Sequence, residues 1–111
     1  MVFPGLPKRI KKVYIWYMNF EFDPAKSRSN KLKHGIDFNE SQELWLSPHF
    51  EFPLKTEGEP RWAIIGTIDA VFWTAIITKR SGVNRIISVR RSRYEEKQAY
   101  ESRFKKEADQ E

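Results

Sequence analysis

The spacing of apolar and polar residues changes along the chain near His49. From there on, four runs are rich in β-branched and aromatic residues or alternate between apolar and polar, which is typical of strands. These runs are His49–Leu54, Arg61–Ile68, Val71–Thr78 and Asn84–Arg91. Ser81-Gly82 separates the last two, as a hairpin turn requires.

The region before the strands carries two sets of helix signals. Asp23 can cap free backbone N–H groups, and Pro24 suits the first helical position, so we predict a helix through Ala25–Lys33 that ends at Gly35. A second helix is expected to begin at Asp37, with a capping box completed by Glu40. We expect it to bury Leu44 and to end before Pro48.

A last helix is expected after the strands. Ser92 and Glu95 have the spacing of another capping box, and a charged helix should follow through about Lys106. The order of helix, helix, four strands and helix predicts an α+β domain, with a mainly antiparallel four-stranded sheet and the helices on one face.

A chain of 111 residues makes a single domain, which we place at residues 18–106. Residues 1–12 combine Pro, Gly and basic residues, so they resemble a loose arm. Met18 would make a natural start, so we interpret residues 1–17 as an N-terminal extension; the alternative is that Val13–Tyr17 adds an edge strand. Residues 107–111 are expected to fray.

The net charge of +5 and the pI of about 9.6 favour a polyanionic partner. The charge is concentrated between Lys79 and Lys106, where ten Lys and Arg residues face only three acidic ones. The absence of cysteine excludes disulfides and thiolate metal sites, and it is typical of cytoplasmic proteins. No apolar run reaches the length of about 20 residues that a membrane span needs.

The strand Asn84–Arg91 is the most informative segment. Side chains alternate across a sheet, so Ile87 and Val89 are expected in the core with Arg85 and Arg91 on the same side. The open face would then carry the other set, Ile86, Ser88 and Arg90. Arg61 begins the second strand, and Lys79 and Arg80 follow the third, so several of these cations are expected to converge on phosphate.

Arginines of this kind suit RNA cleavage, which needs a stabilised phosphorane and two proton transfers. His34 is a candidate for proton transfer near neutral pH, and it equally suits the C-terminus of a helix as a cap. The two histidines lie in different elements and the carboxylates lack a clustered spacing, so we expect no metal and no other cofactor. The sequence also lacks a Gly-rich phosphate loop.

Several short pieces, in order, resemble the BrnT family of type II toxin–antitoxin toxins. They are Phe22-Asp23-Pro24 with Lys26 and Asn30, Lys33-His34-Gly35, Phe38, Gly58-Glu59 with Arg61, Gly66, Arg85-Ile86-Ile87-Ser88-Val89-Arg90-Arg91, Glu96 and Tyr100. The resemblance covers about Asn19 to Tyr100. It implies a RelE-like fold and a metal-independent endoribonuclease that cleaves mRNA and arrests growth.

The resemblance also implies a BrnA-type antitoxin, which neutralises the toxin and carries the complex to operator DNA. It assigns phosphate binding and transition-state charge to Arg61, Arg85 and Arg90. His34, Glu59 or Tyr100 would move protons, and Glu96 would orient an arginine. Further RNA contacts are expected from Lys33, Lys79, Arg80, Ser88, Arg91 and Arg93. The alternative is a non-catalytic RNA-binding or regulatory module on the same scaffold.

Overall fold

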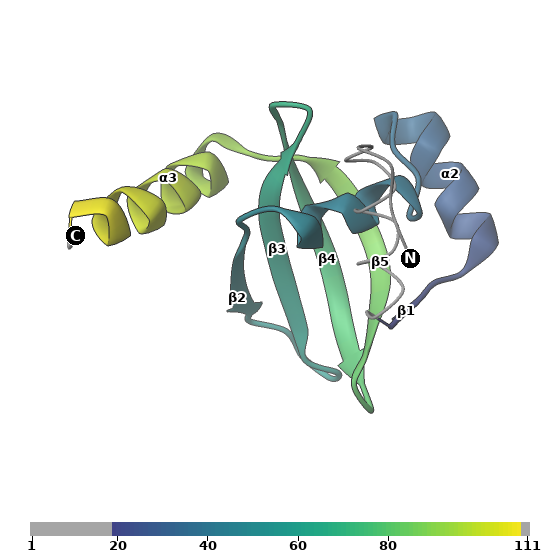
Figure 1. Cartoon of the computed structure of the whole chain (residues 1–111). Coiled ribbons are helices and arrows are strands. Elements are labelled where there is room, and N and C mark those ends of the chain that lie inside the picture. The colour runs from purple at the N-terminus through teal and green to yellow at the C-terminus, as the bar shows by residue number, and fades with distance from the viewer. Residues whose placement is uncertain (1–18, 110–111) are drawn as a thin grey trace, which may run out of the picture.

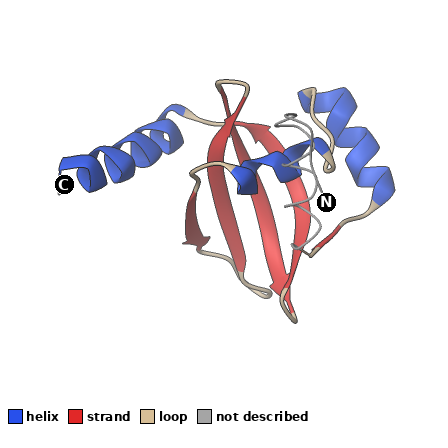
Figure 2. Cartoon of the chain, viewed as in Figure 1, coloured by secondary structure: helices blue, strands red, loops and turns tan. Residues whose placement is uncertain are grey.

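The computed structural model describes residues 19–109, which form one mixed sheet and three helices (Figures 1 and 2). The strands are β1 (Phe20–Glu21), β2 (Phe50–Leu54), β3 (Arg61–Ile68), β4 (Val71–Arg80) and β5 (Val83–Arg91). Their order in the sheet is β1-β5-β4-β3-β2. The four predicted strands are confirmed, but the sheet has a fifth strand, because the short β1 pairs in parallel with the start of β5. The predicted extension, residues 1–17, lies outside the described residues.

The helices lie on both faces of the sheet, not on one face as predicted. The short helix η1 (Glu40–Leu46) covers one face, and helix α2 (Pro24–His34) lies along β5 (Figure 1). Helix α3 (Tyr94–Asp109) runs across the strand direction near the end of the sheet that holds the β3–β4 turn (Figure 1). Tyr100 of α3 stacks edge-on against Phe72, a residue that alternation along β4 places on the second face. We call this end of the sheet the upper end, and the end with the β4–β5 turn the lower end.

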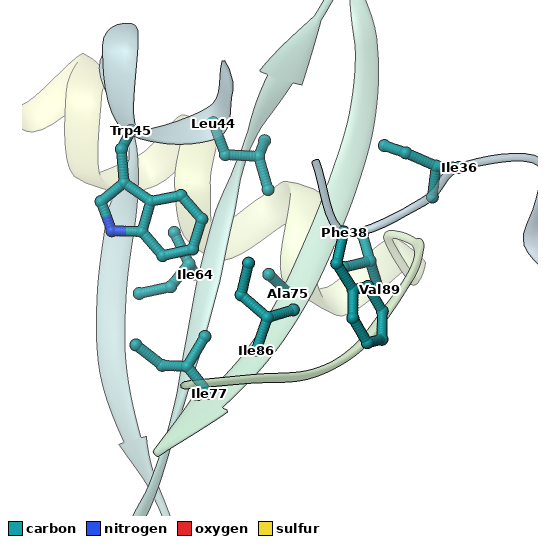
Figure 3. Close-up of a cluster of buried hydrophobic side chains, with 9 residues drawn as sticks. All are labelled: Ile36, Phe38, Leu44, Trp45, Ile64, Ala75, Ile77, Ile86 and Val89. Atoms are coloured by element: carbon teal, nitrogen blue, oxygen red, sulfur yellow. The ribbon is translucent and has the colours of Figure 1, made fainter. Parts of the chain in front are cut away.

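The hydrophobic core lies between the sheet and the segment from Ile36 to Leu46, which includes η1 (Figure 3). Phe38 and Leu44 from the chain around η1 are fully buried in the same cluster as Ile64 of β3. The other buried members of the cluster are Ile36, Trp45, Ala75, Ile77, Ile86 and Val89. This apolar layer fixes the orientation of the sheet, so the opposite face carries the alternate residues of each strand together with α3.

Helix α2 begins and ends as its sequence predicts. Asp23 caps it, since its carboxylate accepts hydrogen bonds from the backbone N–H groups of Ala25 (2.8 Å) and Lys26 (3.4 Å). Gly35 closes it with a φ of 83°, a left-handed conformation that glycine adopts without a steric penalty. The helix places two polar side chains, Ser27 and Asn30, in the interior.

The second predicted helix is shorter and tighter than expected. The capping box forms, because Glu40 N donates to the Asp37 carboxylate (2.7 Å) and Asp37 N donates to that of Glu40 (3.0 Å). However, η1 begins only at Glu40 and is a 3-10 helix. It packs closely on β3: a Cβ on Gly66 would lie 3.3 Å from a methyl carbon of Leu44. Absence of a side chain at Gly66 therefore allows this approach.

The capping box predicted from Ser92 and Glu95 is wrong by one residue. The structure instead pairs the backbone N–H of Arg93 with the carboxylate of Glu96 (2.7 Å), and α3 begins at Tyr94. Glu96 thereby leaves the solvent side of the helix and turns toward the sheet. Helix α3 continues to Asp109, past the predicted end.

A β-bulge in β5 changes which side chains face the core. Ser88 pairs with Ile76, but the next pair is Ile86 with Ile77, so Ile87 is the extra residue. Ile86 and Val89 are consequently buried in the core, and Ile87 is only partly buried. The predicted simple alternation is therefore wrong. Its main consequence is that Arg85 moves to the same face as Ser88 and Arg90.

Candidate functional site

The sheet surface opposite α2 and η1, which we call the open face, brings together basic residues from β3, β4 and β5. Its register is fixed by three cross-strand pairs of β4 and β5: Thr74 with Arg90, Ile76 with Ser88, and Thr78 with Arg85. Each of these β4 residues is next in the sequence to a core residue, Ala75 or Ile77, so its side chain points away from the core. The predicted site residues Arg85, Ser88 and Arg90 therefore share a face.

At the upper end, Arg90 is held by Glu96 in a two-pronged ion pair. Arg90 Nη1 donates to Glu96 Oε1 at 2.7 Å, and Nη2 donates to Oε2 at 2.9 Å. The two side chains are 23% and 14% exposed, so the pair is shielded from much of the solvent. Burial alone would weaken an ion pair, but this parallel geometry is the strongest that a guanidinium and a carboxylate can form.

The Glu96 carboxylate is saturated with donors. Besides Arg90, it accepts hydrogen bonds from Arg93 N (2.7 Å) and from the hydroxyl of the buried Thr74 (3.1 Å), which also bonds to Ser92 Oγ (2.8 Å). Burial raises the pKa of Glu96, but the hydrogen bonds from Arg90 and Arg93 outweigh it and hold the pKa below its ordinary value. Glu96 is thus a fixed anion that orients Arg90, which the sequence suggested for it.

This arrangement leaves one side of the Arg90 guanidinium available. Of its five N–H donors, two bond to Glu96 and one to the carbonyl oxygen of Arg91 (3.4 Å). Nε–H and the second hydrogen on Nη2 have no acceptor within residues 19–109. These two donors form the lateral fork of an arginine, whose spacing matches two oxygens of a phosphate.

At the lower end, two arginines flank Thr78. Arg85 pairs with Thr78 from one side, and extending the β3–β4 register by one residue beyond Trp62 places Arg61 on the other side. Arg85 meets the carboxylate of Glu21 at 3.5 Å, and Arg61 has no ion pair with any described residue. Thr78 is 1% exposed, and its hydroxyl finds no hydrogen-bond partner in residues 19–109.

Glu59 and Arg80 form a second two-pronged pair at this end. Arg80 Nε and Nη2 donate to the two oxygens of Glu59 at 2.8 and 2.9 Å. The hydrogen bond from Arg80, followed by the charges of Arg61 and Arg85, lowers the pKa of Glu59. A carboxyl in this environment stays ionised near neutral pH, which disfavours the predicted proton transfer by Glu59 and suits a counter-ion.

His34 lies in the last turn of α2, the end of the helix that is directed toward the upper end of the sheet (Figure 1). Helix α2 runs beside β5 in the same direction (Figure 1), and Asn30 bonds to the backbone of Val89, the residue before Arg90. His34 is about one helical turn beyond Asn30, and its side chain is partly buried. Lys33 and His34 both lie in the last turn of α2, where the helix dipole favours positively charged side chains.

Tyr100 is a structural contact in this conformation. Its hydroxyl donates to the carbonyl oxygen of Pro48 at 3.2 Å, and its ring packs on Phe72 and Phe104. Burial raises the pKa of its hydroxyl. These contacts hold α3 on the sheet and leave the predicted proton transfer without a geometric basis here.

The remaining predicted RNA-binding cations do not join the open face. Lys79 pairs with Glu51 (2.8 Å) and lies over the ring of Trp62, and Arg91 lies over Trp73; alternation places both on the core side of the sheet. Arg93 is exposed at the start of α3. Alternation along β5 had already placed Arg91 opposite Ser88 and Arg90, and the bulge at Ile87 does not change this.

Two residues that matter for the site were given no role from the sequence. Thr74 is a polar residue inside the apolar run of β4, and it turned out to bind Glu96. Asn30 is buried and bonds to both backbone groups of Val89. Both carried a usable signal, because a polar side chain at an apolar position of an element requires a partner.

Within residues 19–109, no three His, Cys, Asp or Glu side chains are grouped to hold a metal ion. None of the described helices is both long and apolar enough to cross a membrane.

Comparison with known proteins identifies the family. No curated protein matches the chain. The model of one protein family, described as the ribonuclease toxin BrnT of type II toxin–antitoxin systems, matches residues 22–96. The match extends from the start of α2 to Glu96, so it includes all the strands of the open face, and it covers more than half of the chain. The chain therefore belongs to the BrnT family of ribonuclease toxins of type II toxin–antitoxin systems.

Proposed function

We propose that this protein is an endoribonuclease toxin that cleaves mRNA on the open face without a metal ion and arrests growth. The observation that carries the proposal is the lateral fork of Arg90, which Glu96 holds in place while two donors have no acceptor in residues 19–109. Donors that are already oriented stabilise developing charge without further reorganisation, and this electrostatic contribution is usually the largest in catalysis.

The reaction is a transesterification followed by release of two RNA ends. The ribose 2′-oxygen loses its proton and forms a bond to the adjacent phosphorus, and the bond from phosphorus to the 5′-oxygen breaks as that oxygen gains a proton. The products are a 2′,3′-cyclic phosphate and a 5′-hydroxyl. Arg90 would bind the two non-bridging oxygens, whose charge increases in the phosphorane.

We assign the proton transfer to His34. The lowered pKa of Glu59 disfavours it as a proton carrier, and the hydroxyl of Tyr100 is committed to Pro48. His34 shares the upper end of the sheet with Arg90, through the contact of Asn30 with Val89. Imidazole is the side chain best suited to exchange a proton near neutral pH.

The family membership implies a protein antitoxin, and we propose that it is of the BrnA type. In this account the antitoxin neutralises the toxin in the cytoplasm, and operator DNA is bound only by the complex. The basic open face, with Arg61, Arg85 and Arg90, is then reserved for RNA.

Induction of the protein in growing bacteria tests the proposal. The wild type should stop growth and deplete mRNA, and co-expression of the antitoxin should restore growth. Arg90→Ala should relieve the arrest while the purified variant remains folded, and Arg28→Ala, on the exposed side of α2, should stay as toxic as the wild type. An Arg90→Ala variant that is fully toxic would overturn the site assignment.

A further inference from the structure

The arginines of the open face form two separate groups. Thr74, opposite Arg90, and Thr78, opposite Arg85, are four residues apart on β4, a distance of about 13 Å at the usual strand rise. Arg90 is fixed to Glu96 on α3 and is not directed toward the lower end. One phosphate held by the fork of Arg90 is therefore not shared with Arg61 and Arg85.

The lower group has the properties of a phosphate site of its own. Arg80 is neutralised by Glu59 in a two-pronged pair, whereas Arg61 has no ion pair with a described residue and Arg85 has only a long one with Glu21. Between them, the buried hydroxyl of Thr78 has no partner in residues 19–109. A buried polar group without a partner is destabilising, so a ligand that supplies an acceptor would relieve it.

The residues between the two groups of arginines are uncharged. The row between them in the sheet consists of Ser88, Ile76 and, by the register of β3 and β4, Ala63. Ser88 and Ile76 are partly exposed and Ala63 is buried, so an RNA strand that crosses this row meets no acidic side chain from it. The separation of about 13 Å corresponds to about four stacked nucleotides at a rise of 3.4 Å each, and to fewer when the strand is extended.

We propose that Arg61 and Arg85, together with Thr78, form a second subsite that binds a backbone phosphate a few nucleotides from the cleaved bond. This proposal rests on the proposed function for the identity of the ligand, single-stranded RNA. The subsite anchors the strand and does not touch the reacting atoms, so it contributes to the binding of longer substrates and not to the chemical step.

Chimeric oligonucleotides with a single ribonucleotide in a DNA strand test the subsite, because they are cut at one defined bond. The length on each side of that bond is varied from one to eight nucleotides. For the wild type, kcat/KM should rise in a step when one side gains the phosphate that reaches the lower end. Arg61→Ala/Arg85→Ala should lose roughly tenfold or more of the rise in kcat/KM at that step. Arg28→Ala is the matched control.

Binding of all-deoxy oligonucleotides of the same lengths, which cannot be cleaved, tests the subsite independently of the proposed ribonuclease function. If the wild type cuts nothing but the double variant loses the length step in binding, the subsite stands and the proposed function fails. If the double variant keeps the wild-type length dependence, the subsite is wrong. Thermal unfolding checks that the variants fold, and Arg61→Gln/Arg85→Gln replaces the alanine pair if that pair does not.

Discussion

Asn30 of α2 pairs with Val89 of β5 as a neighbouring strand would. Its Nδ2 donates to Val89 O at 2.8 Å, and Val89 N donates to its Oδ1 at 3.2 Å. The same Nδ2 also donates to Ile36 O at 2.8 Å. β1 pairs with β5 only at Asn84 and Arg85, so this amide replaces the missing strand at Val89. It also fixes the helix that carries His34 to the strand that carries Arg90.

Replacement of Asn30 by alanine should destabilise the protein strongly. Three buried backbone groups would lose their partner, so the free energy of unfolding should fall by about 2–4 kcal/mol. Ser29→Ala, on the exposed side of the same helix, serves as the control and should change the free energy of unfolding by less than about 0.5 kcal/mol. Urea denaturation measures both. Equal stability of the two variants would mean that the Asn30 amide does not hold α2 on the sheet.

Glu96 should make the protein sensitive to acid. Its pKa is lowered in the folded state, so the stabilisation is present above its ordinary value of 4.5 and is lost as the pH falls through the folded pKa. Glu40 and Glu59 shift in the same direction and contribute to the same window. Unfolding measured from pH 6 to pH 2 should show a shallower acid decline for Glu96→Gln than for the wild type.

The exposed Glu57 provides the control for this titration. Glu57→Gln should keep the acid decline of the wild type, because no ion pair with Glu57 is present among the described residues. An identical decline for Glu96→Gln and the wild type would contradict the role of Glu96 as a buried, ionised clamp.

Arg90→Lys separates charge from geometry. The lysine keeps the positive charge but has neither the end-on pair with Glu96 nor a lateral fork. We expect kcat on a short RNA to fall by about 10²–10³, the effect of losing one oriented donor group, while KM changes little. Arg28→Lys should behave as the wild type. Full activity of Arg90→Lys would show that only charge is needed at this position.

Two buried threonines on β4 should respond in opposite ways to replacement by valine. Thr78→Val removes a buried hydroxyl without a partner, so the free energy of unfolding should rise by about 1 kcal/mol. Thr74→Val removes a hydroxyl that bonds to Ser92 and Glu96, so the free energy of unfolding should fall by about 1–2 kcal/mol. Thermal unfolding of the two variants compares them directly. A stability loss in both would show that the Thr78 hydroxyl is satisfied in solution.

The sequence predicted those parts of the fold that depend on local signals. Asp23, Pro24 and Gly35 gave the bounds of α2 closely, and Ser81-Gly82 forms the predicted turn, with a φ of 50° at Ser81 and 79° at Gly82. These signals act through the backbone of their own segment, so they need no knowledge of the tertiary structure.

Features that depend on contacts between distant segments were missed. Ile86 and Ile87 are both apolar, so the sequence does not show which of them is the bulged residue, and this decides the side of Arg85. The choice of Glu96 over Glu95 as the cap of α3 depends on Arg90 and Thr74, which only the folded sheet brings close. The strand β1 is two residues long and exists through its pairing with β5.

Cleavage of a labelled single-stranded RNA by the purified protein in EDTA tests the central claim most directly. The wild type should cut the RNA and leave a 2′,3′-cyclic phosphate, Arg90→Ala should not cut it, and Arg28→Ala should. Cutting that requires an added divalent metal, or cutting by Arg90→Ala at the wild-type rate, would contradict a metal-independent mechanism centred on Arg90. RNA that is bound but never cut would point to a binding module on the same scaffold.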